Sequence, residues 1–188
     1  MVTLTGILRR LGPYGRRLAW DLEFRKGAYF SGKRSPILVQ IIGKYCEGKD
    51  VVELACGDGS LAKELAKVNF RSYHGFDISK AAVNIAQRME DNRYRFAVAD
   101  MESWSPNLYL DVLIIEEAIY YLDHAAQRAL IHRVATRIRN SGCVIIAFHS
   151  VKKFSAVIVR IREFGQILEE FQDGDRYYMV LSVAMSEP

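Results

Sequence analysis

The chain has 188 residues, of which half are apolar and about a quarter are charged, and its formal net charge is +4. This length and balance indicate one soluble domain of ordinary size and exclude a disordered chain. Four prolines and 13 glycines exclude collagen-like and low-complexity sequence. No apolar run approaches the roughly 20 residues of a membrane span, and we see no secretory signal, so a cytoplasmic protein is expected.

The positive charge is concentrated at the N-terminus. Residues 1–34 carry eight Lys and Arg against two acidic residues, whereas the rest of the chain carries 18 basic and 20 acidic residues. We therefore divide the chain into a basic, aromatic arm (1–34) and a main domain (35–188). A solubilising face explains the arm most simply, and attraction to an anionic substrate, RNA or a membrane surface is the alternative. The arm supplies the aromatic residues Tyr14, Trp20, Tyr29 and Phe30, which could close over a ligand as a lid or pack on the sheet edge. Tyr29 and Phe30 are candidates for lining a substrate pocket.

The three cysteines, Cys46, Cys56 and Cys143, lie far apart and form no CxxC pair. This odd, sparse set argues against a disulfide framework and against a structural zinc site, and favours buried, reduced side chains. No cluster of His, Cys, Asp and Glu has the spacing of metal ligands. The sequence therefore predicts no metal.

After the arm, short apolar runs alternate with amphipathic stretches. The runs predicted as strands are Asp50–Ala55, Ser72–Asp77, Arg93–Ala99, Asp111–Ile115 and Gly142–Phe148. The stretches predicted as helices are Ile37–Tyr45, Ser60–Val68, Ser79–Glu90, Asp123–Asn140 and Ser155–Phe164. Ser141-Gly142 is typical of a helix end. Two last strand-like runs around Asp173-Gly174 predict a β-hairpin.

Strands that alternate with helices require right-handed crossovers and a parallel sheet covered on both faces. The predicted fold class is therefore α/β, a Rossmann-like doubly wound sheet, mostly parallel, with a C-terminal antiparallel hairpin. In such sheets ligands bind beyond the carboxyl ends of the strands. We expect the residues at those ends, Ala55, Asp77, Asp100, Glu116 and His149, to face one crevice.

The loop from Glu53 to Ser60 joins the first predicted strand to a helix and reads Glu-Leu-Ala-Cys-Gly-Asp-Gly-Ser. Its glycines allow close approach of a ligand to the backbone, and the helix start offers amide groups. Asp77, at the end of the second strand, is placed to accept hydrogen bonds from a ribose diol. Asp100 follows the third strand. The loop together with these two acids is a strong indication of a nucleoside cofactor.

Roughly residues 36–188 resemble the class I S-adenosylmethionine-dependent methyltransferases. The segments that carry the resemblance are Val51–Ser60, with Ala55 in place of the first glycine of the motif, Phe76–Ser79, Ala99–Met101 and Asp111–Leu122. The last segment is similar to the fourth-strand motif of small-molecule methyltransferases, above all the nodulation-factor N-methyltransferases.

The resemblance implies S-adenosyl-L-methionine as cofactor. It places Asp77 on the ribose, Asp100 on the exocyclic amine of adenine and the amide of Met101 on the adenine ring, with Ile78 and Met101 sandwiching the base. Glu116 lies where the amino group of the methyl donor would approach. The implied cofactor-binding set is Glu53, Ala55, Gly57, Gly59, Asp77, Ile78, Asp100, Met101 and Glu116.

The main alternative is a nicotinamide-binding Rossmann domain. Its GxGxxG loop would require glycines where Ala55 and Ser60 stand, and pyrophosphate binding gives no role to Glu53. Helix capping is the simpler explanation of Asp77 or Asp100 taken singly. The combined pattern favours the methyltransferase.

Methyl transfer is an in-line displacement that depends mainly on alignment and needs no metal. His149 is the candidate general base, with a structural hydrogen bond at the strand end as the alternative. Glu117 and Tyr120 are candidate substrate-binding residues. The alternatives are a solvated helix start for Glu116 and Glu117 and a place in the core for one of Tyr120 and Tyr121. Glu116-Glu117-Ala-Ile stands in place of the Asn/Asp-Pro-Pro-Tyr motif, which favours a small-molecule acceptor over a nucleobase amine. RNA, protein and an anionic metabolite stay open because of the basic arm, as does a cofactor-binding scaffold without turnover.

Overall fold

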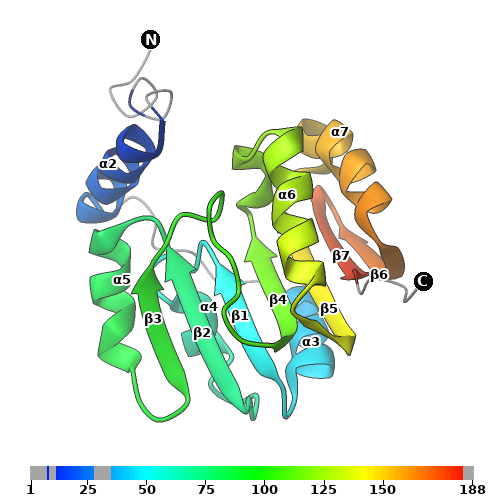
Figure 1. The fold of residues 1–188 in the computed structure, drawn as a ribbon, viewed down its shortest axis with the longest axis horizontal. Coiled ribbons are helices and arrows are strands. Elements are labelled where there is room, and N and C mark those ends of the chain that lie inside the picture. Colours follow the sequence, from blue (N-terminus) through cyan, green and yellow to red (C-terminus); the bar gives the residue numbers. More distant parts are fainter. Residues whose placement is uncertain (1–7, 9–11, 28–34, 184–188) are drawn as a thin grey trace.

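The computed structural model describes residues 8, 12–27 and 35–183 (Figure 1). Their strands form one seven-stranded sheet in the order β3-β2-β1-β4-β5-β7-β6. The strands are β1 (Asp50–Leu54), β2 (Ser72–Asp77), β3 (Tyr94–Val98), β4 (Leu110–Glu116), β5 (Ile138–Phe148), β6 (Gln166–Asp173) and β7 (Arg176–Ser182). The α-helices are α2 (Gly12–Arg25), α3 (Pro36–Cys46), α4 (Ser60–Glu64), α5 (Lys80–Ala86), α6 (His124–Ala135) and α7 (Val151–Ile161). Short 3-10 turns are η1 (Gln87–Met89), η2 (Ile119–Tyr121) and η3 (Arg162–Phe164).

Five parallel strands form the larger part of the sheet. β1 pairs with β2 and with β4, β2 pairs with β3, and β4 pairs with β5, all in parallel. β7 is antiparallel to both β5 and β6, so the hairpin forms one edge. The predicted fold class is confirmed.

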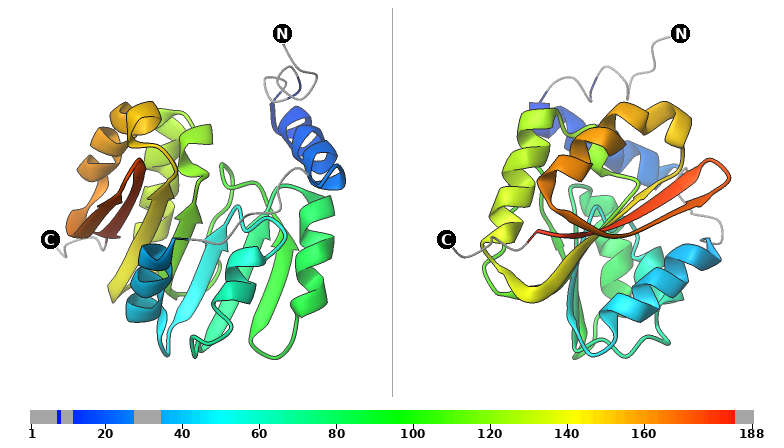
Figure 2. Two further views of the ribbon diagram at one scale, coloured as in Figure 1. Left: turned by 180° about the vertical axis from the view of Figure 1, so that it is seen from behind. Right: turned by 90° about the vertical axis from the view of Figure 1, so that its right-hand side faces the viewer.

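Helices cover both faces of the sheet (Figure 2). One apolar layer holds α3, α4 and α5, where Leu38, Leu61 and Val83 are buried against the sheet. The other layer holds α6 and α7, with Leu130 and Ile158 in its core. Both faces of β4 are therefore covered, which explains its almost continuous apolar sequence.

Side chains fix the starts of several helices. Ser35 caps α3 by accepting a hydrogen bond from the amide of Ile37, and Pro36 occupies the first helical position, as expected. Ser79, Asp123 and Ser150 cap α5, α6 and α7 in the same way. These caps set the positions of the loops that follow the carboxyl ends of β2, β4 and β5.

The region around residues 136–142 differs from the expectation. The predicted helix Asp123–Asn140 ends at Ala135, and the chain already forms strand β5 from Ile138 onward. Gly142 is therefore a strand residue and no helix cap. A β-carbon at this position would lie 2.5 Å from the backbone oxygen of Asp111, so close approach of two strands explains the glycine.

Two other helices have different ends from those predicted. The predicted helix Ser60–Val68 stops at Glu64, and the helix predicted for Ser155–Phe164 runs from Val151 to Ile161. Within the described part of the chain, no helix has the length and apolar character that crossing a bilayer requires.

Candidate functional site: a cavity at the carboxyl ends of the strands

A cavity of about 430 Å³ lies beyond the carboxyl ends of the parallel strands. This volume falls in the range of small-molecule sites. The predicted site residues that line it are Glu53, Ala55, Gly57, Asp77, Ile78, Asp100, Met101, Glu116, Glu117, Tyr120 and His149. Gly59 is not among its lining residues, and Tyr29 and Phe30 lie outside the described residues.

The loop between β1 and α4 has left-handed backbone at three positions. The φ angles are +61° at Ala55, +55° at Gly57 and +76° at Gly59. A β-carbon on Gly59 would lie 2.3 Å from Cε of Met89, so this glycine is required by packing as well as by its backbone angle. Ala55 adopts the same kind of conformation with a side chain and bears the strain that a glycine would avoid.

Asp77 connects this loop to the next one. Its Oδ2 accepts a hydrogen bond of 2.8 Å from the amide of Gly57, and its Oδ1 accepts one of 2.8 Å from the amide of Ser79. Burial raises the pKa of Asp77 to about 6, although these amide hydrogen bonds act in the opposite direction. Each carboxylate oxygen has a second lone pair, so the group can accept further hydrogen bonds from a ligand in the cavity.

Asp100 is held from two sides. Its Oδ1 accepts a hydrogen bond of 2.9 Å from the amide of Glu102, and Nη2 of Arg16 lies 3.1 Å from its Oδ2. Arg16 also forms an ion pair with Glu102. A side chain of the N-terminal arm thus reaches the carboxylate that the sequence assigns to adenine.

Glu53 lies on the buried side of the cavity, with 1% of its surface exposed. The hydroxyl of Tyr73 donates a hydrogen bond to its carboxylate. Burial raises the pKa of Tyr73 well above its usual value, and the adjacent Glu53 adds to this effect. Tyr73 therefore stays a neutral donor that satisfies a buried carboxylate.

A second group of side chains lies at the ends of β4 and β5. Nδ1 of His149 lies 3.2 Å from the hydroxyl of Tyr120 and 3.7 Å from Oε2 of Glu117. Glu117 has a φ angle of +52°, which is rare for a residue other than glycine and typical of functional sites. Tyr120 stacks on Phe154, with ring centroids 3.8 Å apart. Both polar neighbours contact the same ring nitrogen, Nδ1, so neither of them engages Nε2 of His149.

Helix α2 lies beyond the carboxyl ends of the strands (Figure 1) and supplies residues to the lining of the cavity. Trp20 packs edge-to-face on Tyr121 with 5.3 Å between ring centroids. Oδ1 of Asp21 accepts hydrogen bonds from the hydroxyl of Ser79 (2.7 Å) and the amide of Ala81 (2.9 Å). Another arm aromatic, Tyr14, is 88% exposed and lies outside this cavity.

Several lining residues are not among the predicted ones. They include Arg16, Phe24, Arg176 and Tyr178. Arg16 and Phe24 belong to the basic, aromatic arm, whose composition was the available signal. Arg176 and Tyr178 belong to the hairpin, and no local motif marks them.

Within the described ranges, no group of three or more His, Cys, Asp or Glu side chains is placed to hold a metal ion. Cys46, Cys56 and Cys143 are free and buried, as expected. Burial raises the pKa of the Cys56 thiol well above its usual value. Although Cys56 lines the cavity, its thiol is thus kept protonated and is unsuited to nucleophilic chemistry.

Residues 51–142 match the family model of a methyltransferase domain. Nodulation protein S of Sinorhizobium fredii (strain NBRC 101917 / NGR234) is 25% identical over 120 residues, which make up 63% of this chain and 52% of that protein. The chain thus spans about half the length of the relative that it matches.

Two solved structures are similar over most of the chain. The N-methyltransferase NodS from Bradyrhizobium japonicum WM9, in complex with S-adenosyl-L-homocysteine, has 16% identity and a TM-score of 0.66, and the match covers 77% of this chain and 83% of that one. The magnesium protoporphyrin IX methyltransferase from Synechocystis PCC 6803, with bound S-adenosyl-L-homocysteine, has 17% identity and a TM-score of 0.64, with coverage of 88% and 95%. These likenesses establish the fold. Together with the domain match they confirm the predicted resemblance to class I methyltransferases, and they support the predictions of an enzyme and of its cofactor.

Proposed function

We propose that this chain, whose residues 51–142 form a methyltransferase domain, binds S-adenosyl-L-methionine in the cavity and transfers its methyl group to a nitrogen or oxygen atom of a small molecule. The observation that carries this proposal is the convergence of the glycine turn, Asp77 and Asp100 on one cavity. A glycine turn, a ribose-type acid and an adenine-type acid fit an adenosyl group. No pyrophosphate-binding loop of the GxGxxG kind is present at this turn.

The described residues suit each part of this cofactor. Asp77 would accept hydrogen bonds from the ribose hydroxyls, and Ile78 and Met101 would contact the faces of the adenine. Asp100 would accept from the adenine amine through an oxygen lone pair that Arg16 and the Glu102 amide leave open. Glu53 and Glu116 line the same cavity, and we assign them to the amino acid part of the cofactor.

When bound, S-adenosyl-L-methionine supplies an electrophilic methyl group on a sulfonium. The protein then has to align a nucleophile of the acceptor with that methyl group, and it has to remove a proton from the nucleophile. Nε2 of His149 is the group that we assign to the proton, because Tyr120 and Glu117 hold the ring at Nδ1. Glu117 and Tyr120 also face the space where the acceptor would lie. Helix α2 would act as a lid that excludes water during transfer.

A small-molecule acceptor is favoured by the size of the cavity, about 430 Å³. Trp20 and Tyr121, which pack edge-to-face, both belong to its lining and offer aromatic surface to such a molecule. NodS from Bradyrhizobium japonicum is an N-methyltransferase, which supports nitrogen as the acceptor atom here. RNA or protein methylation, for which the basic arm is the argument, is the second candidate.

Calorimetry with S-adenosyl-L-methionine, and separately with NAD, tests the cofactor assignment. We expect binding of the methyl donor and none of NAD. Saturation at about 100 times the dissociation constant should add roughly 2.7 kcal/mol to the free energy of unfolding, which a melting experiment detects. Binding of NAD without binding of the methyl donor would contradict the proposal.

Formation of S-adenosyl-L-homocysteine over panels of amines, alcohols and RNA tests turnover. Gly57→Arg is the control, because Gly57 has left-handed backbone and a β-carbon there would lie 3.2 Å from Phe24. Product formation with small molecules supports the proposed acceptor class. Turnover with RNA alone would favour the second candidate, and tight binding without turnover on any panel would indicate a scaffold.

A further inference from the structure

We propose that Arg176 is a specificity-determining residue that binds an anionic group, a carboxylate or a phosphate, on the methyl acceptor. This inference rests on the proposed function and adds the chemical class of its acceptor. Arg176 lines the same cavity as the predicted cofactor residues. It is the first residue of β7, beside the hairpin turn, on the side of the cavity away from Asp77 and Asp100.

The sheet register places Arg176 across the cavity from the acidic end of β4. Glu116 is paired with Ala147 on β5, and Ala147 is paired with Tyr178 on β7. Arg176 precedes Tyr178 by two residues and therefore shares its face of the strand. Two strand spacings separate β4 from β7, so the backbones lie about 10 Å apart at this level. A small molecule spans that distance.

The guanidinium of Arg176 is not committed to a structural ion pair. No ion pair or side-chain hydrogen bond to it is found among residues 12–27 and 35–183, and its surface is exposed. The two carboxylates of the adjacent turn have other partners. Asp173 accepts a hydrogen bond from the hydroxyl of Ser35, and Asp175 accepts from the hydroxyl of Ser150 and the amide of Lys152.

The charged side chains on the acceptor side belong to two different strands. Glu116 and Glu117 are at the end of β4, whereas Arg176 is at the start of β7, where the pairing of Phe148 with Tyr177 places it next to His149 of β5. A neutral ligand that filled this space would cover Arg176 and leave its charge without a partner, which is costly. A carboxylate or phosphate would match the paired N–H groups of the guanidinium. The arrangement therefore selects an acceptor that carries its anionic group close to the nitrogen or oxygen atom that receives the methyl group.

Binding of simple probes to the protein saturated with S-adenosyl-L-homocysteine tests this assignment by calorimetry. The probes are benzoate, phenyl phosphate and the neutral benzamide, whose ring suits the lining of Tyr120, Phe148 and Tyr178. We expect the wild type to bind at least one anion tenfold or more tightly than benzamide. The comparison of benzoate with phenyl phosphate tells which anion the site prefers.

Variants test whether Arg176 causes the preference for an anion over benzamide. Arg176→Gln should abolish the preference for the anion, and Arg176→Lys should retain part of it. Arg128→Gln removes the same charge from an exposed position on α6 and should leave the preference unchanged. Equal binding of anions and benzamide to the wild type, or an unchanged preference in Arg176→Gln, would overturn the inference.

The two proposals fail in different ways. If S-adenosyl-L-homocysteine does not bind, the proposed function fails, and the same probes are then titrated into the unloaded protein. If it binds and the anion preference is absent, the proposed function stands and the role of Arg176 is wrong. Melting temperatures of the three variants, each measured with and without S-adenosyl-L-homocysteine, show whether the fold and the cofactor site are intact.

Discussion

The Asp77 carboxylate is buried, yet it must be ionised to serve as a double acceptor for a ribose. Burial raises its pKa to about 6, compared with an ordinary value near 3.8, against the opposing effect of two amide hydrogen bonds. The folded protein therefore binds a proton at this site more strongly than the unfolded chain does between about pH 4 and pH 6. Ionisation of the buried Asp77 carboxyl therefore lowers the free energy of unfolding at neutral pH.

The contribution of Asp77 to the free energy of unfolding should accordingly be highest below pH 4 and be lost as the pH rises through 6. The loss amounts to roughly 3 kcal/mol, because one pKa unit corresponds to about 1.36 kcal/mol. Asp77→Asn lacks this titration. Urea unfolding of both proteins from pH 4 to pH 7 should show the variant gaining stability relative to the wild type as the pH rises. A constant difference would show that the pKa is not raised.

Cofactor binding should follow the same ionisation in the opposite direction. Hydrogen bonds from the ribose hydroxyls stabilise the charged carboxylate of Asp77, so affinity for S-adenosyl-L-methionine should rise with pH. With a pKa of about 6, the ionised fraction of Asp77 grows about tenfold from pH 5 to pH 7, and the affinity should grow by about that factor. In Asp77→Asn we expect weaker binding that is nearly independent of pH. A pH-independent wild type would contradict this role of Asp77.

Ala55 is the residue at which the sequence departs from the glycine-rich motif. Its φ angle of +61° is a conformation that glycine adopts freely and that strains an L-residue by about 1–2 kcal/mol. Ala55→Gly should remove this strain, partly offset by the greater freedom of glycine in the unfolded chain. We expect a gain of about 0.5–1 kcal/mol in the free energy of unfolding, measured by urea titration. Destabilisation would show that packing of the methyl group outweighs the strain.

At the scale of single residues, strand ends were the predictable part of the site. Asp77, Asp100 and His149 could be placed because each follows a short apolar run, and parallel strands end at one edge. Arg16 and Arg176 could not, because they reach the cavity from an arm and from a hairpin that are distant in sequence. Nothing local distinguishes these arginines from others on the surface.

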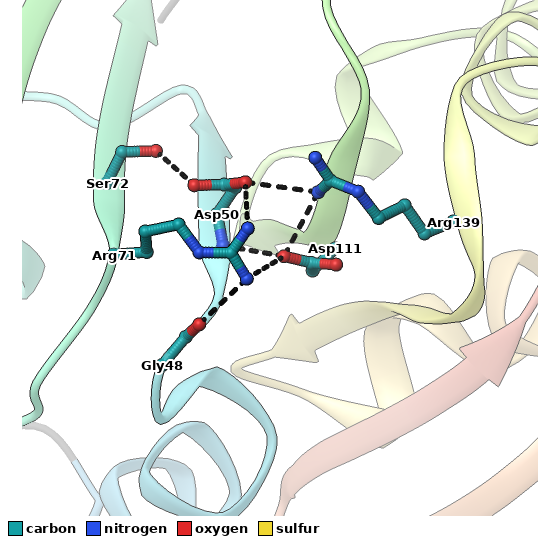
Figure 3. Close-up of polar contacts among 6 residues, drawn as sticks. All are labelled: Gly48, Asp50, Arg71, Ser72, Asp111 and Arg139. Carbon is teal, nitrogen blue, oxygen red and sulfur yellow. Dashed lines mark hydrogen bonds and ion pairs between the residues drawn. The ribbon is translucent and has the colours of Figure 1, made fainter.

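At the scale of elements, a cluster of four charged side chains holds together the amino ends of the strands, opposite the carboxyl ends where the cavity lies (Figure 3). Asp50 begins β1 and Asp111 lies near the start of β4, where Oδ2 of Asp111 accepts a hydrogen bond of 2.8 Å from the amide of Asp50. Arg139 of β5 lies 3.1 Å from both carboxylates. Arg71 contacts Asp50 at 3.1 Å and Asp111 at 3.6 Å. The cluster thus joins the starts of three strands.

Asp111→Ala should destabilise the fold by about 2–3 kcal/mol, because it leaves the amide of Asp50 without its acceptor and two arginines with one carboxylate. Asp111→Asn keeps an acceptor oxygen and should cost less. Urea unfolding measures both. Affinity for S-adenosyl-L-methionine should be unchanged in both folded variants, because the cavity lies at the carboxyl ends of the strands, far from this cluster. If Asp111→Ala lowers the free energy of unfolding by less than 0.5 kcal/mol, water satisfies the remaining charged groups in place of Asp111.

The same cluster explains the one large error in the predicted elements. Leu130, Ile131, Val134 and Ile138 recur at helical spacing, so the sequence favoured a helix that continued past Ala135. Pairing of Ile138 with Leu110, and the contacts of Arg139 with Asp50 and Asp111, favour a strand instead. These contacts join residues far apart in the chain and override the local periodicity.

At the scale of the whole molecule, the arm completes a cavity that the sheet leaves open. Helix α2 is joined to the main domain by polar contacts of Arg16 and Asp21 and by the packing of Trp20 on Tyr121. Fold and core could be predicted without it, because the two apolar layers lie on the faces of the sheet. The sequence offered a lid over the cavity only as one of several possible roles of the basic, aromatic arm.

Removal of residues 1–30 should therefore leave the main domain folded and reduce turnover more than cofactor binding. Without Arg16, Trp20 and Phe24 the cavity loses one wall, so water enters and the nucleophile is no longer aligned with the methyl group. We expect a loss of at least 100-fold in kcat, and a smaller rise in the Kd of S-adenosyl-L-methionine, measured by S-adenosyl-L-homocysteine formation and by calorimetry.

Arg16→Gln provides the matched test of the ion-pair contribution. It removes the contact with Asp100 and keeps the rest of the arm, so it should weaken cofactor binding and change kcat little. The decrease in cofactor affinity should shrink as salt is added.

If the arm instead recruits a polyanion, the full-length protein should bind RNA or anionic vesicles, with affinity that falls steeply with salt. A truncated protein with full turnover and unchanged binding of cofactor, RNA and vesicles would reduce the arm to a solubilising extension, because its contacts over the cavity would then have no functional consequence.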